Sequence, residues 1–377
     1  MTQVLTGIDV LEREGFAPLR GRRVGLVTNH TGLARDGRTT IDVLHRAKEV
    51  ELAALFGPEH GIRGEKDERV ADGTDAKTGL PVYSLYGARE KPTPEQLRDV
   101  DTLVFDIQDI GCRFYTYIST LGNVMEAAGE QGLRVVVLDR PNPITGQHVE
   151  GPLADEDKLS FTAYHPLPVR HGMTVGELAR LFHAERGLSC PLDVVPCEGW
   201  RRGDWYDATG LLWTDPSPNM RALMAAALYP GVGLLEMTNL SVGRGTDAPF
   251  ELVGAPFMDA HALAAALNAE RLPGVRCYPV RFTPRASRFA GESCGGVRLL
   301  VTDREALDAV RVGLTLAAVL RRLYPQDWQH GKLLTLLANQ KVFDAVAAGA
   351  DYRALVQIWD ADLREFLARR ARFLLYL

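Results

Sequence analysis

This chain of 377 residues lacks the features that mark several protein classes. Its five cysteines are scattered, odd in number and without CxxC spacing, so they indicate neither a disulfide framework nor a zinc site. No apolar run reaches the length of a membrane span. The net charge of −5 and the lack of a lysine-rich block argue against a nucleic-acid partner. The composition is that of an ordinary soluble globular protein.

Common cofactor and nucleophile motifs are missing too. The chain contains no GxxxxGK[ST] phosphate loop and no HExxH, and the turn after the first predicted strand lacks GxGxxG. Residues 291–295 match GxSxG, but a nucleophile elbow needs a strand before it and a helix after it, and here a strand is predicted to follow. We therefore expect no cofactor.

The first residues show neither the basic region nor the apolar core of a signal peptide. We expect a cytoplasmic protein, although a different native start would leave export open.

The first half of the chain alternates short apolar runs with amphipathic segments. These predict strands at 23–28, 50–56, 102–106, 133–138 and 192–196, and helices at 39–48, 118–131 and 174–186. Right-handed βαβ units then give an α/β fold with a Rossmann-like, mostly parallel sheet. Residues 199–245 have little periodicity and are rich in Trp, Pro, Asn and Gly, so we expect long ordered loops there.

The pattern changes near residue 250. A helix at 259–270, strands at 275–282 and 296–301, a long helix at 304–323 and further helical segments predict a smaller α+β domain. We therefore expect two domains, a catalytic one at 1–248 and an auxiliary one at 249–377.

Polar side chains follow four of the predicted strands. In an open parallel sheet the carboxyl ends of the strands share one edge, where ligands bind. The groups expected at this edge are Asn29, His30, Glu59, His60, Asp106, Gln108, Asp109, Asp139, Arg140 and Asn142. Asn and Asp are also ordinary turn residues, so a purely structural role is the alternative for Asn29, Asp139 and Asn142.

The densest group of ionisable side chains is in residues 55–65, LFGPEHGIRGE. Glu59, His60, Arg63 and Glu65 follow an apolar strand and lie among glycines and a proline. Such a turn adds little to stability, and rigid turns at strand ends are where α/β enzymes keep their active sites. This segment predicts an enzyme.

Carboxylates at loop positions suggest glycosidic cleavage, in which one carboxyl group protonates the leaving oxygen. A second stabilises or attacks the anomeric carbon, or activates water. The candidates are Glu59, Glu65, Asp109 and Glu236.

Aromatic and cationic residues could complete a sugar site. Candidates for stacking on a pyranose ring are Trp200, Trp205, Tyr206 and Trp213, although tryptophans more commonly lie in a core. Arg170, with His171 beside it, and Arg244 could bind a substrate carboxylate, with a solvated arginine as the alternative.

Several ordered motifs together resemble one family. They are NHTG (29–32), FGPEHG (56–61), FDIQD (105–109), RFYTY (113–117), DRPNP (139–143), PVRHGMT (168–174), PSPNM (216–220), YPG (229–231) and TNLSVGRGT (238–246). The chain is similar, from about Gly7 to Leu377, to the DUF1343 family, whose characterised members are exo-β-N-acetylmuramidases of the NamZ type.

The resemblance implies an exo-acting hydrolase that releases N-acetylmuramic acid from the non-reducing ends of peptidoglycan fragments. It implies a Rossmann-like domain, a smaller C-terminal domain and a small-molecule or oligosaccharide substrate. Glu59 is then the first catalytic carboxylate and either Glu65 or Asp109 the second, with His60 tuning Glu59. Arg170 or Arg244 would grip the lactyl carboxylate that N-acetylglucosamine lacks.

Further residues of these motifs are expected to bind substrate. They are Asn29, His30, Arg113, Tyr117, Arg140, Asn142, His171, Asn219, Glu236 and Asn239. We expect no metal, because hydrolysis by two carboxylates needs none, although His30, His60 and Asp109 could meet at one edge.

Two alternatives stay open. One is a different glycosidase, such as a β-N-acetylglucosaminidase. The other is a non-catalytic protein that binds sugars or muropeptides, against which the several edge carboxylates argue, since binding alone does not require them.

Overall fold

The computed structural model describes residues 3–59, 61–62, 72–87 and 89–377. Within these residues, a seven-stranded sheet has the order β3-β4-β2-β1-β5-β6-β9 and pairs in parallel except between β3 and β4. Its strands are β1 (Arg23–Thr28), β2 (Glu51–Gly57), β3 (Gly73–Thr74), β4 (Pro81–Ser84), β5 (Thr102–Asp106), β6 (Arg134–Leu138) and β9 (Leu192–Val195). The predicted Rossmann-like α/β fold is confirmed.

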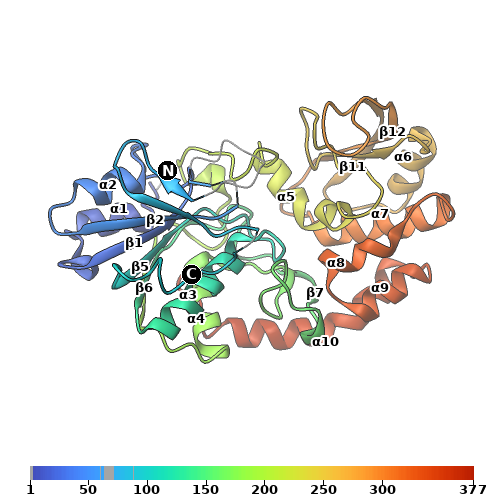
Figure 1. The fold of residues 1–377 in the computed structure, drawn as a ribbon. Helices are drawn as coiled ribbons and strands as arrows, with labels where there is room; N and C mark the ends of the chain where they lie inside the picture. Colours follow the sequence, from blue (N-terminus) through green and yellow to red (C-terminus); the bar gives the residue numbers. More distant parts are fainter. Residues whose placement is uncertain (1–2, 60, 63–71, 88) are drawn as a thin grey trace.

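Helices cover both faces of this sheet (Figure 1). They are α1 (Gly7–Arg13), α2 (Thr40–Arg46), α3 (Tyr117–Gln131) and α4 (Val175–Glu185). In β5, Val104 packs in the cluster with α1 and α2, whereas Leu103 and Phe105 pack with α3 and α4. Because successive side chains of a strand point to opposite faces, a strand covered on both sides is mainly apolar, as residues 103–105 of β5 are.

The order of the strands reverses at β1. The chain runs outward from β1 through β2 to β4, and then returns to β5 on the other side of β1. This reversal is the place where open α/β sheets bind ligands.

The prediction of loops throughout 199–245 is wrong for one segment. Helix α5 (Leu223–Val232) lies there, followed by the 3-10 helix η4 (Gly233–Leu235). Residues 225–232 are all buried, so α5 has no polar face to give a helical period, and it contains Pro230. Its Gly231 packs so closely on the next domain that a Cβ there would lie 1.8 Å from the carbonyl oxygen of Ala309.

The C-terminal part is the predicted smaller α+β domain. Its three-stranded antiparallel sheet, of order β10-β12-β11 in the described residues, consists of β10 (Leu252–Ala255), β11 (Val275–Phe282) and β12 (Cys294–Val301). Its helices are α6 (Ala260–Ala269), α7 (Ala309–Leu323), α8 (Leu333–Leu337), α9 (Gln340–Ala347) and α10 (Tyr352–Arg370).

Two details of this domain bear on the sequence predictions. Helix α7 starts five residues later than predicted, because Asp308 caps it by accepting a hydrogen bond from the backbone nitrogen of Arg311 at 2.8 Å. The GxSxG match leads into strand β12, so it is no nucleophile elbow.

Smaller elements complete the fold. A two-stranded antiparallel sheet that the sequence did not predict pairs β7 (Glu150–Leu153) with β8 (Pro168–Arg170). The other 3-10 helices are η1 (Ala17–Leu19), η2 (Glu156–Lys158), η3 (Tyr206–Ala208) and η5 (His330–Lys332).

The end of the chain returns to the first domain. Helix α10 runs from the C-terminal helices back below the central sheet (Figure 1), and the C-terminal residues reach the carboxyl end of β6, where the hydroxyl of Tyr376 donates to Asp139. The backbone nitrogen of Arg202 donates to the carbonyl oxygen of Leu377 at 2.9 Å. Among the residues described, no helix is both long and apolar enough to span a membrane.

Candidate active site

Glu59 lies at the carboxyl end of β2, two residues after the strand ends. Its side chain is half-buried and accepts a hydrogen bond from Thr116 Oγ1 at 3.1 Å. Thr116 is the N-cap of α3, so the carboxylate lies beside the first turn of a 15-residue helix. The partial positive charge of a helix N-terminus stabilises a carboxylate there.

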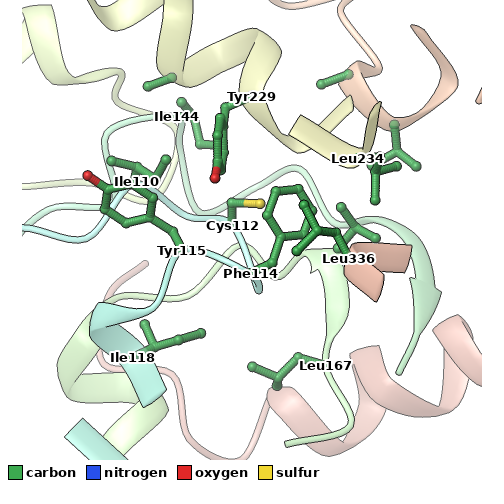
Figure 2. Packing of buried hydrophobic residues seen from close by; sticks show 14 of the residues in the cluster. Ile110, Cys112, Phe114, Tyr115, Ile118, Ile144, Leu167, Tyr229, Leu234 and Leu336 are labelled. Carbon is green, nitrogen blue, oxygen red and sulfur yellow. The ribbon is translucent and has the colours of Figure 1, made fainter. Parts of the chain in front are cut away.

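A row of buried aromatic rings, Tyr117, Tyr115, Tyr229 and Phe250, runs from this point toward the C-terminal domain. The centroids are 5.0 Å apart for Tyr117 and Tyr115, 5.8 Å for Tyr115 and Tyr229, and 4.6 Å for Tyr229 and Phe250. Figure 2 shows Tyr115 and Tyr229 in the core, with Phe114 packed beside Tyr229. The aromatic row therefore connects the sheet edge with α5 and the segment before β10.

Two carboxylates act on the same phenol of this row. Burial raises the pKa of Tyr229, and the negative charges of Glu236 and Glu59 raise it further. Burial and the charge of Glu59 likewise raise the pKa of Tyr117, whose hydroxyl donates to the carbonyl oxygen of Pro216 at 2.6 Å. Both phenols are thus neutral at physiological pH. Because the charges of Glu59 and Glu236 both act on Tyr229, the two carboxylates lie on the same side of the molecule as this ring.

Glu236 and Arg244 form an ion pair at the far end of the aromatic row. The guanidinium of Arg244 lies over the ring of Phe250, 5.5 Å from its centroid. Both residues line a cavity of about 510 Å³, whose other lining residues are Met237, Leu240, Ser241, Val242, Ser287, Arg288 and Phe289. This cavity is large enough to hold a substituent of a sugar.

Asp109 lies deeper than Glu59, with 4% of its surface exposed. Its Oδ2 accepts from the backbone nitrogen of Gly111 at 2.7 Å and lies 3.6 Å from Nε2 of His171. Because His171 Nδ1 accepts from the backbone nitrogen of Met173, the proton of a neutral ring is on Nε2, toward Asp109. The charge of Asp109 also contributes to raising the pKa of Tyr115.

Three arginines expected to bind substrate make hydrogen bonds or ion pairs within the protein. Arg140 makes two hydrogen bonds to Asp106, at 2.6 and 2.9 Å, and Arg170, fully buried, pairs with Glu150. Arg113 donates to the backbone carbonyl oxygens of Pro152, Leu167, Leu336 and Leu337. These guanidinium groups join segments of the chain, and their expected contacts with substrate stay predictions.

Two asparagines hold turns. The side chain of Asn142 bridges the carbonyl oxygen of Met173 and the backbone nitrogen of Ile144. The side chain of Asn239 likewise donates to the carbonyl oxygen of Asp327 and accepts from the backbone nitrogen of Gln329. These hydrogen bonds are those expected for the turn alternative, and the substrate contacts of Asn142 and Asn239 stay predictions.

Asn29 and His30 directly follow β1, at the edge of the sheet. Asn29 is buried, and its Oδ1 accepts from the backbone nitrogen of Thr31 at 2.9 Å. His30 is half-buried, with Nε2 2.7 Å from the carbonyl oxygen of Asp215, and Asn219 is 9% exposed. His60 and Glu65 lie outside the described residues.

The aromatic residues considered for sugar stacking lie mainly in the core. Trp200, Trp205 and Tyr206 are 4%, 2% and 7% exposed, and Trp213 is half-buried. In the described ranges, no three His, Cys, Asp or Glu side chains are grouped so as to hold a metal ion.

Sequence reasoning did not single out Thr116, Tyr115 or Tyr229 as site residues. All three lie within the RFYTY and YPG motifs. These motifs indicated the family, but they did not show that Thr116 donates a hydrogen bond to Glu59. The available signal was the position of Thr116 two residues before a predicted helix, since threonine is a favoured residue at helix N-termini.

Comparison with known proteins places these observations in a family. The profile described as "Exo-beta-N-acetylmuramidase NamZ, N-terminal" matches residues 24–224, and the corresponding C-terminal profile matches residues 227–376. The chain is 43% identical over 379 residues to the peptidoglycan β-N-acetylmuramidase NamZ of Bacillus subtilis strain 168, covering 99% of this chain and 92% of that protein.

Solved structures give the same result. A DUF1343 family protein from Bacteroides fragilis superposes with a TM-score of 0.94 at 38% identity, covering 100% of both chains. A second DUF1343 protein from that organism has a TM-score of 0.81 at 30% identity, covering 99% of both chains. This chain belongs to the NamZ exo-β-N-acetylmuramidase family.

Proposed function

We propose that this chain is an exo-β-N-acetylmuramidase that releases N-acetylmuramic acid from the non-reducing ends of peptidoglycan fragments. The observation that carries the proposal is the likeness to a peptidoglycan β-N-acetylmuramidase over 99% of the chain. The half-buried Glu59 at the edge of the sheet, bonded to Thr116, supplies a carboxyl group for the chemistry.

Glu59 is the proposed catalytic carboxylate. Cleavage of a glycosidic bond needs a proton for the leaving oxygen and stabilisation of charge at the anomeric carbon. Glu59 supplies one of these functions from the edge of the sheet. Asp109 and Glu65 remain the proposals for the second catalytic function. Asp109 follows β5, which pairs with β1 on the side opposite β2, and Glu65 follows Glu59 in the same segment of the sequence. His60 is proposed to tune Glu59.

Of the two cations first considered for the lactyl carboxylate, Arg244 is the one that lies beside a cavity. Arg170 is fully buried and bound to Glu150 and to the carbonyl oxygen of Ile144. Arg244 instead lines the cavity of about 510 Å³ beside Glu236. The cavity therefore supports a binding region for the substituent that distinguishes N-acetylmuramic acid.

Product analysis tests the exo mode of action. We expect the protein to release free N-acetylmuramic acid from glycan chains that begin with this sugar and to leave chains that begin with N-acetylglucosamine intact. Mass spectrometry of the products after short incubation separates the possibilities. Internal fragments would contradict exo action, and release of terminal N-acetylglucosamine would favour the glucosaminidase alternative.

We also propose a cytoplasmic location and a role in cell-wall recycling. The five cysteines are all buried and unpaired, which suits a reducing compartment. Cell fractionation with an antibody to the protein tests this, and recovery from the medium or cell envelope would contradict it.

The division into a catalytic part at 1–248 and an auxiliary part at 249–377 is a further proposal. Arg113 in the first part donates to the carbonyl oxygens of Leu336 and Leu337 in the second. We therefore expect residues 1–248 expressed alone to be less stable than the full chain, and circular dichroism melting curves check this.

A further inference from the structure

The cavity beside Glu236 and Arg244 has a second wall, which comes from the C-terminal domain. Residues 283–293 connect β11 and β12, and Ser287, Arg288 and Phe289 of this connection line the cavity. Hairpin connections usually have two to five residues, and longer ones commonly serve a function.

The backbone of this connection is held in an unusual conformation. Ser287 and Phe289 have φ angles of 66° and 61°, in the left-handed region that non-glycine residues rarely adopt. Such conformations are sterically costly and persist only where the surrounding structure fixes them, often at functional sites. Here they flank Arg288 on both sides.

The connection at residues 283–293 is hydrogen-bonded to the turn that contains Arg244. The backbone nitrogen of Arg285 donates to the carbonyl oxygen of Gly245 at 2.8 Å. Gly245 has a φ of +78°, and a Cβ there would lie 2.3 Å from the carbonyl oxygen of Ala286. Arg288 and Arg244 are therefore held on two segments that touch at a residue which must be glycine.

The two arginines differ in their partners. Arg244 is paired with Glu236, so the positive charge of one is offset by the negative charge of the other. Arg288 is exposed, and no ion pair or hydrogen bond joins its guanidinium to any residue in the described part of the chain. Counting the described residues alone, the cavity thus keeps one uncompensated positive charge, next to the apolar surfaces of Met237 and Phe289.

We propose that Arg288 binds the lactyl carboxylate of the muramic acid residue and so determines specificity for it over N-acetylglucosamine. This inference rests on the proposed function and assigns the anion-binding role to a residue outside the motifs that identify the family. A guanidinium binds a carboxylate through two parallel hydrogen bonds, and the apolar lining suits the methyl group of the lactyl ether.

Kinetics on two substrates test the assignment. We compare a chromogenic β-glycoside of N-acetylmuramic acid with the same compound in which the lactyl carboxylate is a neutral amide. Arg288→Ala should raise KM for the acid about 10- to 100-fold with little change in kcat, as expected for loss of a charge-assisted hydrogen bond. It should leave the amide unaffected, and Arg288→Lys should restore part of the affinity for the acid.

Arg285→Ala is the matched control, because Arg285 is an exposed arginine on the same connection that does not line the cavity. It should behave like the unmodified protein on both substrates. Equal losses for Arg288→Ala on acid and amide, or no loss on either, would overturn the assignment.

The two proposals fail in different ways. If the unmodified protein hydrolyses the muramic glycoside and Arg288→Ala does so equally well, only the assignment of Arg288 fails. If the unmodified protein hydrolyses no glycoside, the proposed function fails. Calorimetric binding of free N-acetylmuramic acid then still tests Arg288, since the Arg288→Ala variant should bind it at least tenfold more weakly, and equal binding would contradict its role.

Discussion

The hydroxyl of Tyr376 donates a hydrogen bond of 2.6 Å to Oδ2 of Asp139, so the last residue but one contacts the carboxyl end of β6. The same carboxylate accepts from the backbone nitrogen of Gly176 and from Thr174 Oγ1, each at 2.7 Å. These groups belong to the start of α4. Asp139 therefore joins the chain terminus to the sheet and to a helix, which is a structural task at the edge that also carries Glu59.

Replacing Tyr376 by Phe should destabilise the protein by about 1–2 kcal/mol, because a buried carboxylate loses one donor. Urea unfolding monitored by circular dichroism measures the change. Tyr278→Phe is the control, since Tyr278 is 54% exposed and should tolerate the change. Equal stability of the two variants would show that the Tyr376 bond contributes nothing.

Asp139 should make stability depend on pH. Burial raises the pKa of Asp139 to about 6, above its ordinary value of 3.8, so the folded state holds the proton more tightly than the unfolded chain. Its contribution is therefore present below about pH 4 and is lost as the pH rises through about 6, a change of about 3 kcal/mol.

The Asp139→Asn variant isolates this effect, because an amide cannot lose the proton. We expect the variant to be most destabilised relative to the unmodified protein near pH 4 and least near pH 7, as measured by urea unfolding at several pH values. A penalty that grows with pH would mean that the folded state favours the charged carboxylate.

Arg113→Met should destabilise the protein by at least about 3 kcal/mol, because it removes a donor from each of four buried carbonyl oxygens, among which that of Leu167 also accepts from the backbone nitrogen of Ala154. Arg364→Met, which removes an exposed i,i+4 ion pair, should cost less than about 0.5 kcal/mol. Below the melting temperature, KM should be unchanged in both variants. A near-normal stability with a raised KM would restore the idea that Arg113 contacts substrate.

Thr116→Val should lower kcat about tenfold with little change in KM, because it removes the hydrogen bond that positions Glu59 and keeps the shape of the side chain. Thr116→Ser keeps the hydroxyl and should retain most of the activity. Steady-state kinetics of the two variants on the muramic glycoside measure this, and equal activity would show that Thr116 does not position the carboxylate.

The parts of the fold that sequence predicted well have strong local signals. The middle residues of strands β1, β5 and β6 are continuous runs without polar side chains, because these strands are covered on both faces. Helix α5 was missed because a helix buried on all sides has no amphipathic period. The start of α7 depended on which of several polar residues acts as its cap.

The site was predictable only in outline. The rule that strand ends share one edge placed Glu59 and Asp109 at neighbouring positions around β1. It could not show that Arg113 would donate hydrogen bonds to carbonyl oxygens more than two hundred residues away, or that Arg170 would pair with Glu150. Arg288 has no signal at all in the local sequence, because only the folded chain brings it beside Arg244.

The most direct test of the account compares hydrolysis of matched chromogenic β-glycosides of N-acetylmuramic acid and N-acetylglucosamine by the unmodified protein and by Glu59→Gln. The account predicts release from the muramic substrate alone, and a loss of at least about 10²-fold in kcat for Glu59→Gln while the sugar still binds. Undiminished turnover by Glu59→Gln would remove Glu59 from the catalytic role. Absence of release from the muramic substrate by the unmodified protein would contradict the muramidase function itself.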